Sequence, residues 1–237
     1  MNHLSIGGAV LLAVALFPAG AGAGPTGVAG FAPDTINPRA VALLPTFVDS
    51  TVPNAAVGRR VMDSLIAVSL EAAGYVILPP ELVDPVWRGT VDSAGGYYDP
   101  ATGEVLTGKL VAIRASVAHQ LGAGGLLRAH AGVIRFPYSR KKPLEYGGVS
   151  EVVATGSSGA VPALLLAASI SDSTGTTVQC GLSGIQLLEK GTAWDNRAHP
   201  VKPEKVFADA ERNAAAVQRV LGGFLQHQPS CAPAQAD

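Results

Sequence analysis

A glycine-lysine pattern in the middle of the chain is the closest match to a known chemical motif. Gly103, Gly108 and Lys109 have the G-x4-G-K spacing of a loop that binds nucleotide phosphates. The next residue, Leu110, has no hydroxyl group to hold magnesium, and a Tyr-Tyr-Asp-Pro stretch precedes the pattern where a buried strand would be needed. We therefore expect Thr107 and Lys109 to begin a helix, and we predict no nucleotide site.

The serine and histidine residues show no catalytic pattern. Serines lie between glycines at residues 156–159 and 181–184, but neither stretch has the G-x-S-x-G spacing of a nucleophile elbow. The five histidines are scattered, without the spacing of a metal site. His130 and Arg128 alternate on an expected strand, which is typical of a solvated face. We predict no catalytic residue, metal or cofactor. The alternative is a hydrolase whose catalytic residues are far apart in the sequence.

Two loops contain residue types that are common in binding surfaces. The first has a cationic tip between two tyrosines and would suit an acidic partner, a lipid headgroup or a polyanionic polymer; a solvated hairpin tip is the simpler interpretation. The second loop contains aromatic residues, which often anchor interfaces but also pack on cores. A cleft lined by these aromatics would indicate a periplasmic module that binds a small ligand or a polymer. The residues of the two loops are Tyr138, Arg140, Lys141, Lys142 and Tyr146, and Trp87, Tyr97 and Tyr98.

The composition excludes several classes of protein. The chain has 237 residues, of which 48% are hydrophobic and 15% charged, and its formal net charge is -1. A nucleic-acid-binding domain needs many cations that neutralise phosphates, and a disordered chain combines low hydrophobicity with high net charge. Two cysteines are too few for a disulfide-rich scaffold or a four-thiolate zinc site. We therefore expect a folded protein that does not bind nucleic acid.

The first 23 residues have the pattern of a signal peptide for export. Residues 6–17 are apolar or glycine, which is too short a stretch to span a membrane, and Ala21 and Ala23 fit the A-x-A cleavage pattern. The segment contains no cysteine for lipid attachment. We predict cleavage after Ala23, a periplasmic or secreted protein, and no transmembrane segment in the mature chain. Residues 24–39, rich in glycine and proline, are predicted to be a flexible linker.

Export places Cys180 and Cys231 in a compartment where disulfide bonds form. A bond between them would close a loop of about fifty residues and add about 2–4 kcal/mol of stability. Cys180 alternates with Val178 and Leu182, so we expect its side chain on the apolar side of a strand. The bond then requires the C-terminal helix to end beside that strand. The alternative is a buried Cys180 and a free Cys231 in a frayed tail, residues 228–237.

The hydrophobic pattern predicts an α/β fold that begins with a β-α-β unit. Residues 41–44 and 75–78 are short apolar runs, and residues 54–74 between them have the spacing of an amphipathic helix capped by Asn54. Two such strands usually pair in parallel through a right-handed crossover.

Further elements complete a single mixed sheet with antiparallel hairpins and packed helices. A helical turn over residues 81–87 precedes a loop over 89–103. We then expect a helix over 106–121, strands over 126–136, 149–154, 161–171 and 176–185, and a long C-terminal helix from Pro203. The turn of the last hairpin is predicted at residues 172–175. We place this single domain at residues 40–227.

The order of these elements resembles a superfamily of bacterial envelope proteins. The superfamily includes the curli-secretion (CsgG-like) channel lipoproteins, the penicillin-binding-protein activator lipoproteins and the TolB amino-terminal domain. The stretches that carry the resemblance are a strand ending in proline at residues 41–45, the strand and Pro-Pro-Glu-Leu segment at 74–82, the glycine-rich stretch 121–127, and the Asp-x-x-Gly turn at 172–175. The resemblance covers residues 39–226.

The resemblance implies a non-enzymatic accessory or assembly protein that acts through protein-protein contacts. It implies envelope protein partners, leaves a homo-oligomer open, and brings no catalytic residues, because these relatives are not enzymes. Two departures argue against a membrane channel. The chain has no lipidation cysteine near its start, and it has no pair of long alternating segments of the kind that form membrane hairpins.

Overall fold

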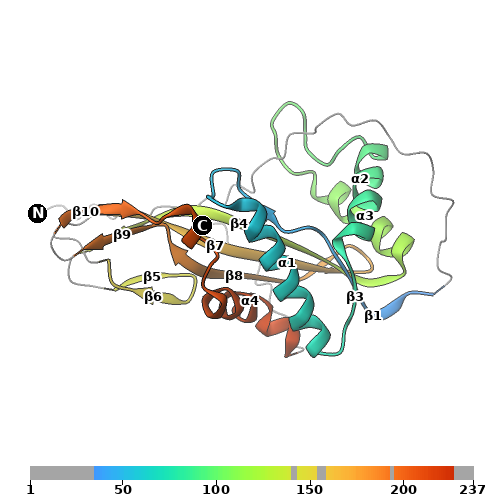
Figure 1. Ribbon diagram of the computed structural model, residues 1–237. Helices are drawn as coiled ribbons and strands as arrows, with labels where there is room; N and C mark the ends of the chain where they lie inside the picture. Colours follow the sequence, from blue (N-terminus) through green and yellow to red (C-terminus); the bar gives the residue numbers. More distant parts are fainter. Residues whose placement is uncertain (1–34, 140–142, 154–158, 193–194, 227–237) are drawn as a thin grey trace, which may run out of the picture. The chain divides into compact units, whose positions relative to one another are not determined.

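The computed structural model describes residues 35–139, 143–153, 159–192 and 195–226, which belong to one compact unit (Figure 1). Its centre is a six-stranded sheet in the order β3-β1-β4-β7-β8, with β2 paired to β4 outside this path. Two smaller pairs, β5-β6 and β10-β9, are separate from this sheet. The predicted fold class, an α/β fold with one mixed main sheet and a C-terminal helix, is confirmed.

The described chain begins with the predicted β-α-β unit. β1 (Asn37–Leu43) pairs in parallel with β3 (Val76–Leu78), and the connection contains the short β2 (Phe47–Val48) and α1 (Ala55–Ala72). β1 begins within the stretch that the sequence indicates as a linker. Asn54 is the N-cap residue of α1, but its φ is 63° and its side chain makes no capping hydrogen bond. The position of this helix is therefore predicted correctly from the sequence, but the expected capping by the Asn54 side chain is not formed.

The second pair of helices differs from the prediction in one respect. α2 (Pro80–Ser93) is a full helix where a single turn and a loop were expected. Proline is well suited to the first turn of a helix because its missing N–H has no partner there, and burial of Val83 stabilises the helix despite Pro85 inside it. α3 (Thr107–Leu121) matches its prediction and ends at Gly122, whose φ of 61° is typical of a helix C-terminus.

Three long antiparallel strands form the rest of the main sheet. β4 (Ala123–Tyr138) pairs with β7 (Gly159–Asp172), and β7 pairs with β8 (Thr177–Leu187) across the predicted turn at residues 172–175. The strand expected over residues 149–154 does not belong to the main sheet. β7 forms an uninterrupted ladder with β4, and the short β5 (Leu144–Tyr146) and β6 (Val149–Glu151) pair only with each other. The longer ladder satisfies more backbone hydrogen bonds.

The C-terminal part contains a hairpin that the sequence did not indicate, β9 (Glu189–Thr192) with β10 (Asp195–Pro200). The final helix begins later than predicted. Only a 3-10 turn, η1 (Pro203–Lys205), forms at the expected start, and α4 (Ala210–Leu225) follows it. Asp209 caps α4, because its Oδ1 accepts a hydrogen bond from the Arg212 amide at 3.0 Å.

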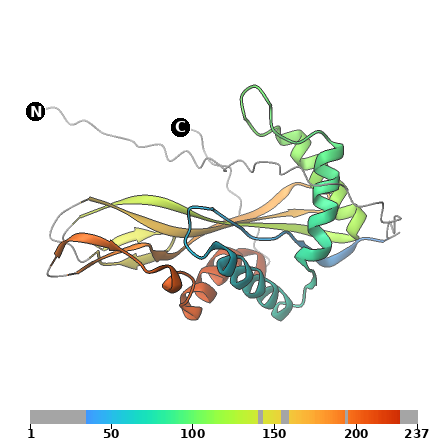
Figure 2. The same ribbon diagram turned by 45° about the horizontal axis from the view of Figure 1, so that its top comes forward.

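The helices cover the two faces of the main sheet unequally. α1 and α4 cover one face, which we call the helical face, and α2 and α3 cover part of the opposite face (Figure 2). Alternate residues of the strands supply the two cores. The helical face receives Val41, Leu43, Leu127 and Ala129, whereas the α2-α3 core receives Ala40, Ala42, Leu44 and Leu126.

Candidate functional site

On the face of the sheet opposite α1 and α4, α2 and α3 are the helices among the described residues that pack, and they cover only part of it. We call the part of this face beyond α2 and α3 the open face. Directly paired residues of antiparallel strands point to the same side of a sheet, so the register of β4, β7 and β8 defines its members. Leu182 is 47% exposed, Cys180 is exposed, and the other members are half-buried. The open face consists of two cross-strand rows, Arg128-Ser169-Cys180 and His130-Ala167-Leu182.

The expectation that Cys180 faces the apolar side of its strand is wrong. The neighbouring Gln179 and Ser183 are buried on the helical face, and Cys180 and Leu182 are exposed on the open face. The cause is close packing of α4 at Gly181, where any Cβ would overlap the carbonyl oxygen of Val220. Cys231 lies outside the described residues, so the Cys180–Cys231 bond stays a prediction.

A cluster of aromatic side chains and Arg128 borders the open face on the side of α2 and α3. The Arg128 guanidinium lies over Trp87, 5.3 Å from the ring centroid, and 5.9 Å from the centroid of Tyr97. Tyr97 is buried, while Trp87 and Tyr98 are half-buried in the same core cluster. Trp87 belongs to α2 and not to a loop. These aromatic side chains are therefore mainly part of the α2-α3 core. They contact the guanidinium of Arg128, which belongs to the open face.

A second arginine lies next to this cluster. Arg114 of α3 donates a hydrogen bond to Thr177 Oγ1 at 2.8 Å. Burial, and then the neighbouring charge of Arg128, lower the pKa of Arg114 to about 10. Among the described residues, neither Arg114 nor Arg128 has a carboxylate within ion-pair distance. This end of the open face therefore carries two cations without an acidic partner in that part of the chain.

His130 forms a contact that the sequence did not indicate. Its Nε2 lies 3.0 Å from Asp49 Oδ1, and its ring is 5.2 Å from that of Phe47. The parallel pairing of β2 with β4 makes this contact. Phe47 of β2 is paired with His130 of β4, and Asp49 is the first residue after β2. A histidine-carboxylate pair can orient a general base, but the residue beside His130 on β7 is Ala167, which has no nucleophile. No sequence spacing links Asp49 to His130, so only the sheet register brings them together.

The predicted cationic loop is only partly visible. Arg140, Lys141 and Lys142 lie outside the described residues, and Tyr138 is half-buried at the end of β4. Tyr146 is 1% exposed and belongs to a core cluster, so its predicted role as a surface anchor is wrong.

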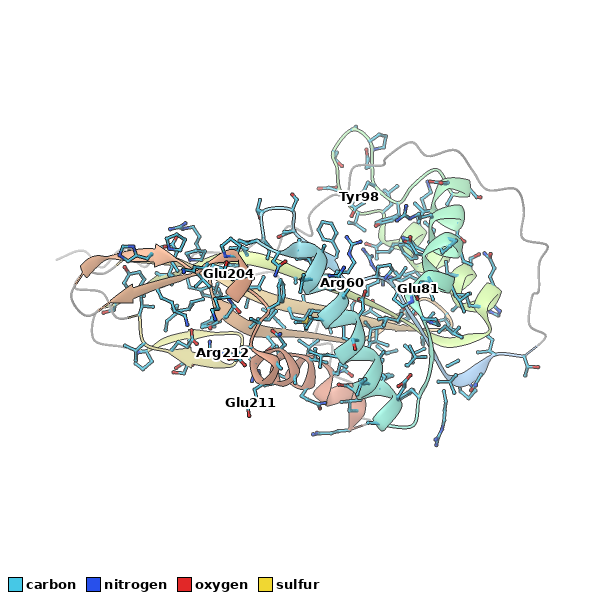
Figure 3. All side chains as sticks on the ribbon, viewed as in Figure 1. Arg60, Glu81, Tyr98, Glu204, Glu211 and Arg212 are labelled. Atoms are coloured by element: carbon cyan, nitrogen blue, oxygen red, sulfur yellow. The ribbon has the colours of Figure 1, made fainter. Side chains whose placement is uncertain are left out.

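Tyr146 is held by a polar network that joins the β5-β6 hairpin to α4. Its hydroxyl donates to Glu151 Oε2 at 2.9 Å, and Glu151 pairs through Oε1 with Arg212, which Figure 3 shows on the side of α4 toward this hairpin. Burial, followed by the charge of Glu151, raises the pKa of Tyr146. The hairpin is thus fixed to the main body by an ion pair and a buried tyrosine.

Two shallow cavities of about 200 Å³ and 180 Å³ lie beside the same hairpin, away from the open face. They are lined mainly by β6 with β9 and by β6 with α4, and neither brings a serine and a histidine together. In the part of the chain that the structure describes, no cluster of three or more metal-ligating side chains is present. None of the helices described here is long and apolar enough to cross a bilayer.

Comparison with known proteins gives remote structural likenesses. No protein-family model matches the chain, and no curated protein sequence matches it. The LpoB C-terminal domain from Salmonella enterica is 12% identical, with 65% of this chain and 87% of that chain covered and a TM-score of 0.33. A putative neuraminyllactose-binding hemagglutinin homolog from Helicobacter pylori is 10% identical, with 86% and 91% covered and a TM-score of 0.37. At these values we assign the chain to no family and draw no function from either likeness.

Proposed function

We propose that this chain is an exported accessory protein of the bacterial envelope that binds another protein and catalyses no reaction. The observation that carries the proposal is the open face, a part of the main sheet that α2 and α3 leave uncovered. It combines an exposed apolar side chain, Leu182, with the cations Arg114 and Arg128. The export pattern in residues 1–23 supports the location.

The chemistry of the open face indicates the kind of partner segment. Leu182 and Ala167 offer apolar surface in one row, and Arg128 lies in the adjacent row. Apolar contacts flanked by charged groups are typical of protein-protein interfaces, in which arginine is enriched. The partner segment is therefore expected to place an apolar side chain on Leu182 and one or more carboxylates near Arg128 and Arg114. Such carboxylates would supply the acidic partners that these arginines lack among the described residues.

The arrangement of polar groups favours binding over catalysis. Acyl transfer needs a nucleophile in contact with the base that activates it, and the His130–Asp49 pair has Ala167 beside it. Ser183, the serine of the 181–184 stretch, faces the opposite side of the sheet and accepts a hydrogen bond from Arg219 Nε at 2.8 Å. A serine engaged in this way on the helical face is separated from the histidine by the thickness of the sheet.

Site-specific photo-crosslinking in the cells that produce the protein tests the proposal. A photoreactive amino acid replaces Leu182 on the open face, and the same amino acid replaces Val68 as a control. Val68 is an equally apolar side chain, 59% exposed on α1 of the helical face. We expect a defined protein adduct from position 182 and not from position 68. The adduct should weaken at least tenfold when Arg128→Glu is added, because the substitution reverses the charge offered to the partner.

Two outcomes would contradict the proposal. One is the same set of adducts from both positions, which would indicate random collision. The other is the absence of an adduct from position 182, both in the full chain and in a chain that ends at Gln226. Arg60→Glu on the exposed side of α1 provides the charge-matched control for Arg128→Glu. It should leave the adduct unchanged.

A further inference from the structure

We infer that Arg114 and Arg128 together bind a single oxyanion group, such as a carboxylate or a phosphate, at the border of the open face with α3. This deepens the proposed function, on which it rests only for the source of the oxyanion, either a protein partner or a free anion. Three observations carry it. The two guanidinium groups lie near each other, most of their donors are unused, and the described chain places no carboxylate within ion-pair distance of them.

The two arginines approach one place from different elements. Arg128 belongs to β4 and is paired with Ser169 of β7 on the open face. Arg114 comes from α3 and donates to Thr177 Oγ1 at the start of β8, with 2.8 Å between nitrogen and oxygen. Burial, and then the charge of Arg128, lower the pKa of Arg114 to about 10, so the two cations lie within reach of mutual repulsion. An anion bound by both replaces this repulsion with two attractions.

Most of the hydrogen-bond donors of this pair are unused. A guanidinium has five N–H donors and no acceptor. Within the described ranges, Arg114 donates to Thr177, whereas the guanidinium of Arg128 donates no hydrogen bond. Arg128 lies over the ring of Trp87, 5.3 Å from its centroid, and this contact supplies no oxygen to its N–H groups. The pair therefore has donors available for a ligand that brings acceptors.

The described groups beside the pair do not neutralise it. Asp49, a carboxylate next to the open face, contacts His130 and not Arg128. Burial, and then Tyr97, raise the pKa of Tyr98 to about 12, and the smaller opposing effect comes from Arg128. Tyr98 is therefore neutral at physiological pH, and its buried hydroxyl has no hydrogen-bond partner in this part of the structure. Partly buried cations without a counter-ion are costly, so a bound anion would stabilise them.

An oxyanion is the ligand that suits two guanidinium groups. Carboxylates and phosphates have two or more oxygens, so one group can accept hydrogen bonds from Arg114 and Arg128 at the same time. Both side chains are half-buried, which strengthens their attraction for an anion relative to that of exposed arginines. A chloride ion has no separate oxygens to match the two planar groups of donors. The site is therefore expected to select oxyanions over chloride.

Nuclear magnetic resonance of the isotope-labelled full chain tests the inference. The side-chain Nε–H signals of Arg60, Arg114 and Arg128 are assigned from lysine variants at these positions. They are then followed while sodium phosphate or sodium acetate replaces sodium chloride at constant ionic strength. We expect the signals of Arg114 and Arg128 to follow one saturation curve with a common dissociation constant. Arg60, exposed on α1 of the helical face, is the internal control and should show no saturable shift.

Two variants test whether Arg128 acts through its charge and its shape. Arg128→Gln removes the charge, and we expect it to weaken phosphate binding, read from the Arg114 signal, by about tenfold or more. Arg128→Lys keeps the charge but not the planar fork, so it should weaken binding by about threefold or more with little change in the backbone amide spectrum. Arg60→Gln is the matched control and should leave the dissociation constant unchanged.

Saturable binding that is weakened by Arg128→Gln and not by Arg60→Gln supports the site. Shifts that rise linearly with concentration, or that are as large for Arg60 as for Arg128, overturn it, because they indicate a general effect of salt. Undiminished phosphate binding by both Arg128 variants overturns the part assigned to Arg128.

A further titration distinguishes the two sources of the oxyanion. The blocked dipeptide acetyl-Leu-Glu-amide carries a carboxylate beside an apolar side chain, as a protein partner would. If it binds about threefold or more tighter than acetate and shifts the methyl signals of Leu182, the site serves a protein partner. Equal binding of the dipeptide and acetate assigns the site to a free anion, and both results support the site.

Failure of this site and failure of the proposed function give different results. Saturable phosphate binding without a crosslinked adduct from position 182 contradicts the proposed function and leaves the site intact. A defined adduct from position 182 without saturable binding of phosphate, acetate or the dipeptide overturns the site and leaves the proposed function intact.

Discussion

The ring of Phe207 packs directly against the backbone of α1 at Gly58. A Cβ built on Gly58 would lie 2.5 Å from Phe207 Cζ and 2.7 Å from its Cδ2, which is well inside van der Waals contact. Phe207 is buried and has a φ of 64°, in the left-handed region that non-glycine residues seldom adopt. Its carbonyl accepts a hydrogen bond from Asn213 Nδ2 at 2.8 Å. The segment before α4 is therefore locked to α1 at a single glycine.

We predict that Gly58→Ala lowers the free energy of unfolding by about 1–3 kcal/mol, because the added methyl overlaps the buried ring of Phe207. Alanine alone would stabilise a helix by about 1 kcal/mol relative to glycine. The control is Gly108→Ala in the first turn of α3, where a Cβ meets no atom within 4 Å. Urea unfolding of both variants makes the comparison. Equal stability of the two variants would contradict the packing described for Gly58 and Phe207.

The second prediction concerns the pH dependence of stability through Asp63. Burial raises the pKa of this carboxyl above its usual 3.8, and the Thr46 amide, which donates to Oδ1 at 2.7 Å, opposes the shift only in part. A raised pKa means that the folded state binds the proton more tightly than the unfolded state. The ionised carboxylate therefore destabilises the fold at neutral pH, and protonation relieves this as the pH falls toward the raised pKa.

Asp63→Asn keeps an oxygen for the Thr46 amide and removes the charge. We expect it to raise the free energy of unfolding at neutral pH, with a gain that shrinks as the solution is made acidic. Denaturant unfolding over this pH range is the measurement. Asp63→Ala is the control, since it removes both the charge and the acceptor and leaves the Thr46 amide without its partner. A gain that is the same at all pH values would contradict the assignment.

The third prediction concerns the attachment of the β5-β6 hairpin. Removing the Arg212 side chain leaves Glu151 with the Tyr146 hydroxyl as its remaining partner among the described residues. We expect Arg212→Ala to lower stability by about 1 kcal/mol, because the guanidinium is partly exposed. Hydrogen exchange should accelerate in β5 and β6 but not in β7 and β8, as expected for local opening. Arg88→Ala, which breaks an exposed pair with Asp84 on α2, should change neither quantity.

The fourth prediction concerns the turn between β7 and β8. Asp172 Oδ1 accepts hydrogen bonds from the amides of Thr174 at 2.9 Å and Thr176 at 3.1 Å, and Gly175 has a φ of 81°. A Cβ on Gly175 would overlap the backbone of α3 at Val111. Gly175→Ala should lower the free energy of unfolding by about 2 kcal/mol or more, from the left-handed backbone and the overlap together.

Gly96→Ala separates these two causes. Gly96 has a similar φ of 75°, but a Cβ there meets no atom within 4 Å. Its replacement should lower the free energy of unfolding by only about 1 kcal/mol, the contribution of the backbone conformation. Thermal or denaturant unfolding of the two variants gives the difference. A loss at Gly175 no larger than that at Gly96 would show that the turn does not depend on its contact with α3.

Local signals in the sequence predict most of the elements but not their ends. The turn at residues 172–175 was predictable because Asp172 and Gly175 have local roles that their types alone indicate. The start of α4 was misplaced at Pro203, since proline marks the beginning of a 3-10 turn as readily as that of an α-helix. α2 was predicted too short, because Gly89 suggests the start of a loop. Packing of Val83 and Trp87 in the α2-α3 core overrides that signal.

The open face could not be predicted, because it depends on which side of the sheet each helix covers. Cys180 and Leu182 share one side of β8, as the alternation predicts, but that side is exposed and not buried. Val178 lies where the pairing with β7 is irregular, and it packs against the core of the helical face. Gly181 decides that choice by allowing α4 to approach, and this requires knowledge of a helix that comes much later in the chain. The His130–Asp49 contact depends in the same way on the pairing of β2 with β4.

The pairing of α1 with α4 makes the folding of α1 wait for the synthesis of α4. Gln218 Nε2 of α4 donates to Ser69 Oγ of α1 at 3.2 Å, and the buried side of α1 shares one core with Val217 and Leu221. A nascent chain emerges from its amino end, so α4 cannot cover Met62, Ile66 and Leu70 until residues 210–225 have been synthesised. Until then the apolar side of α1 is a surface for chaperones and proteases.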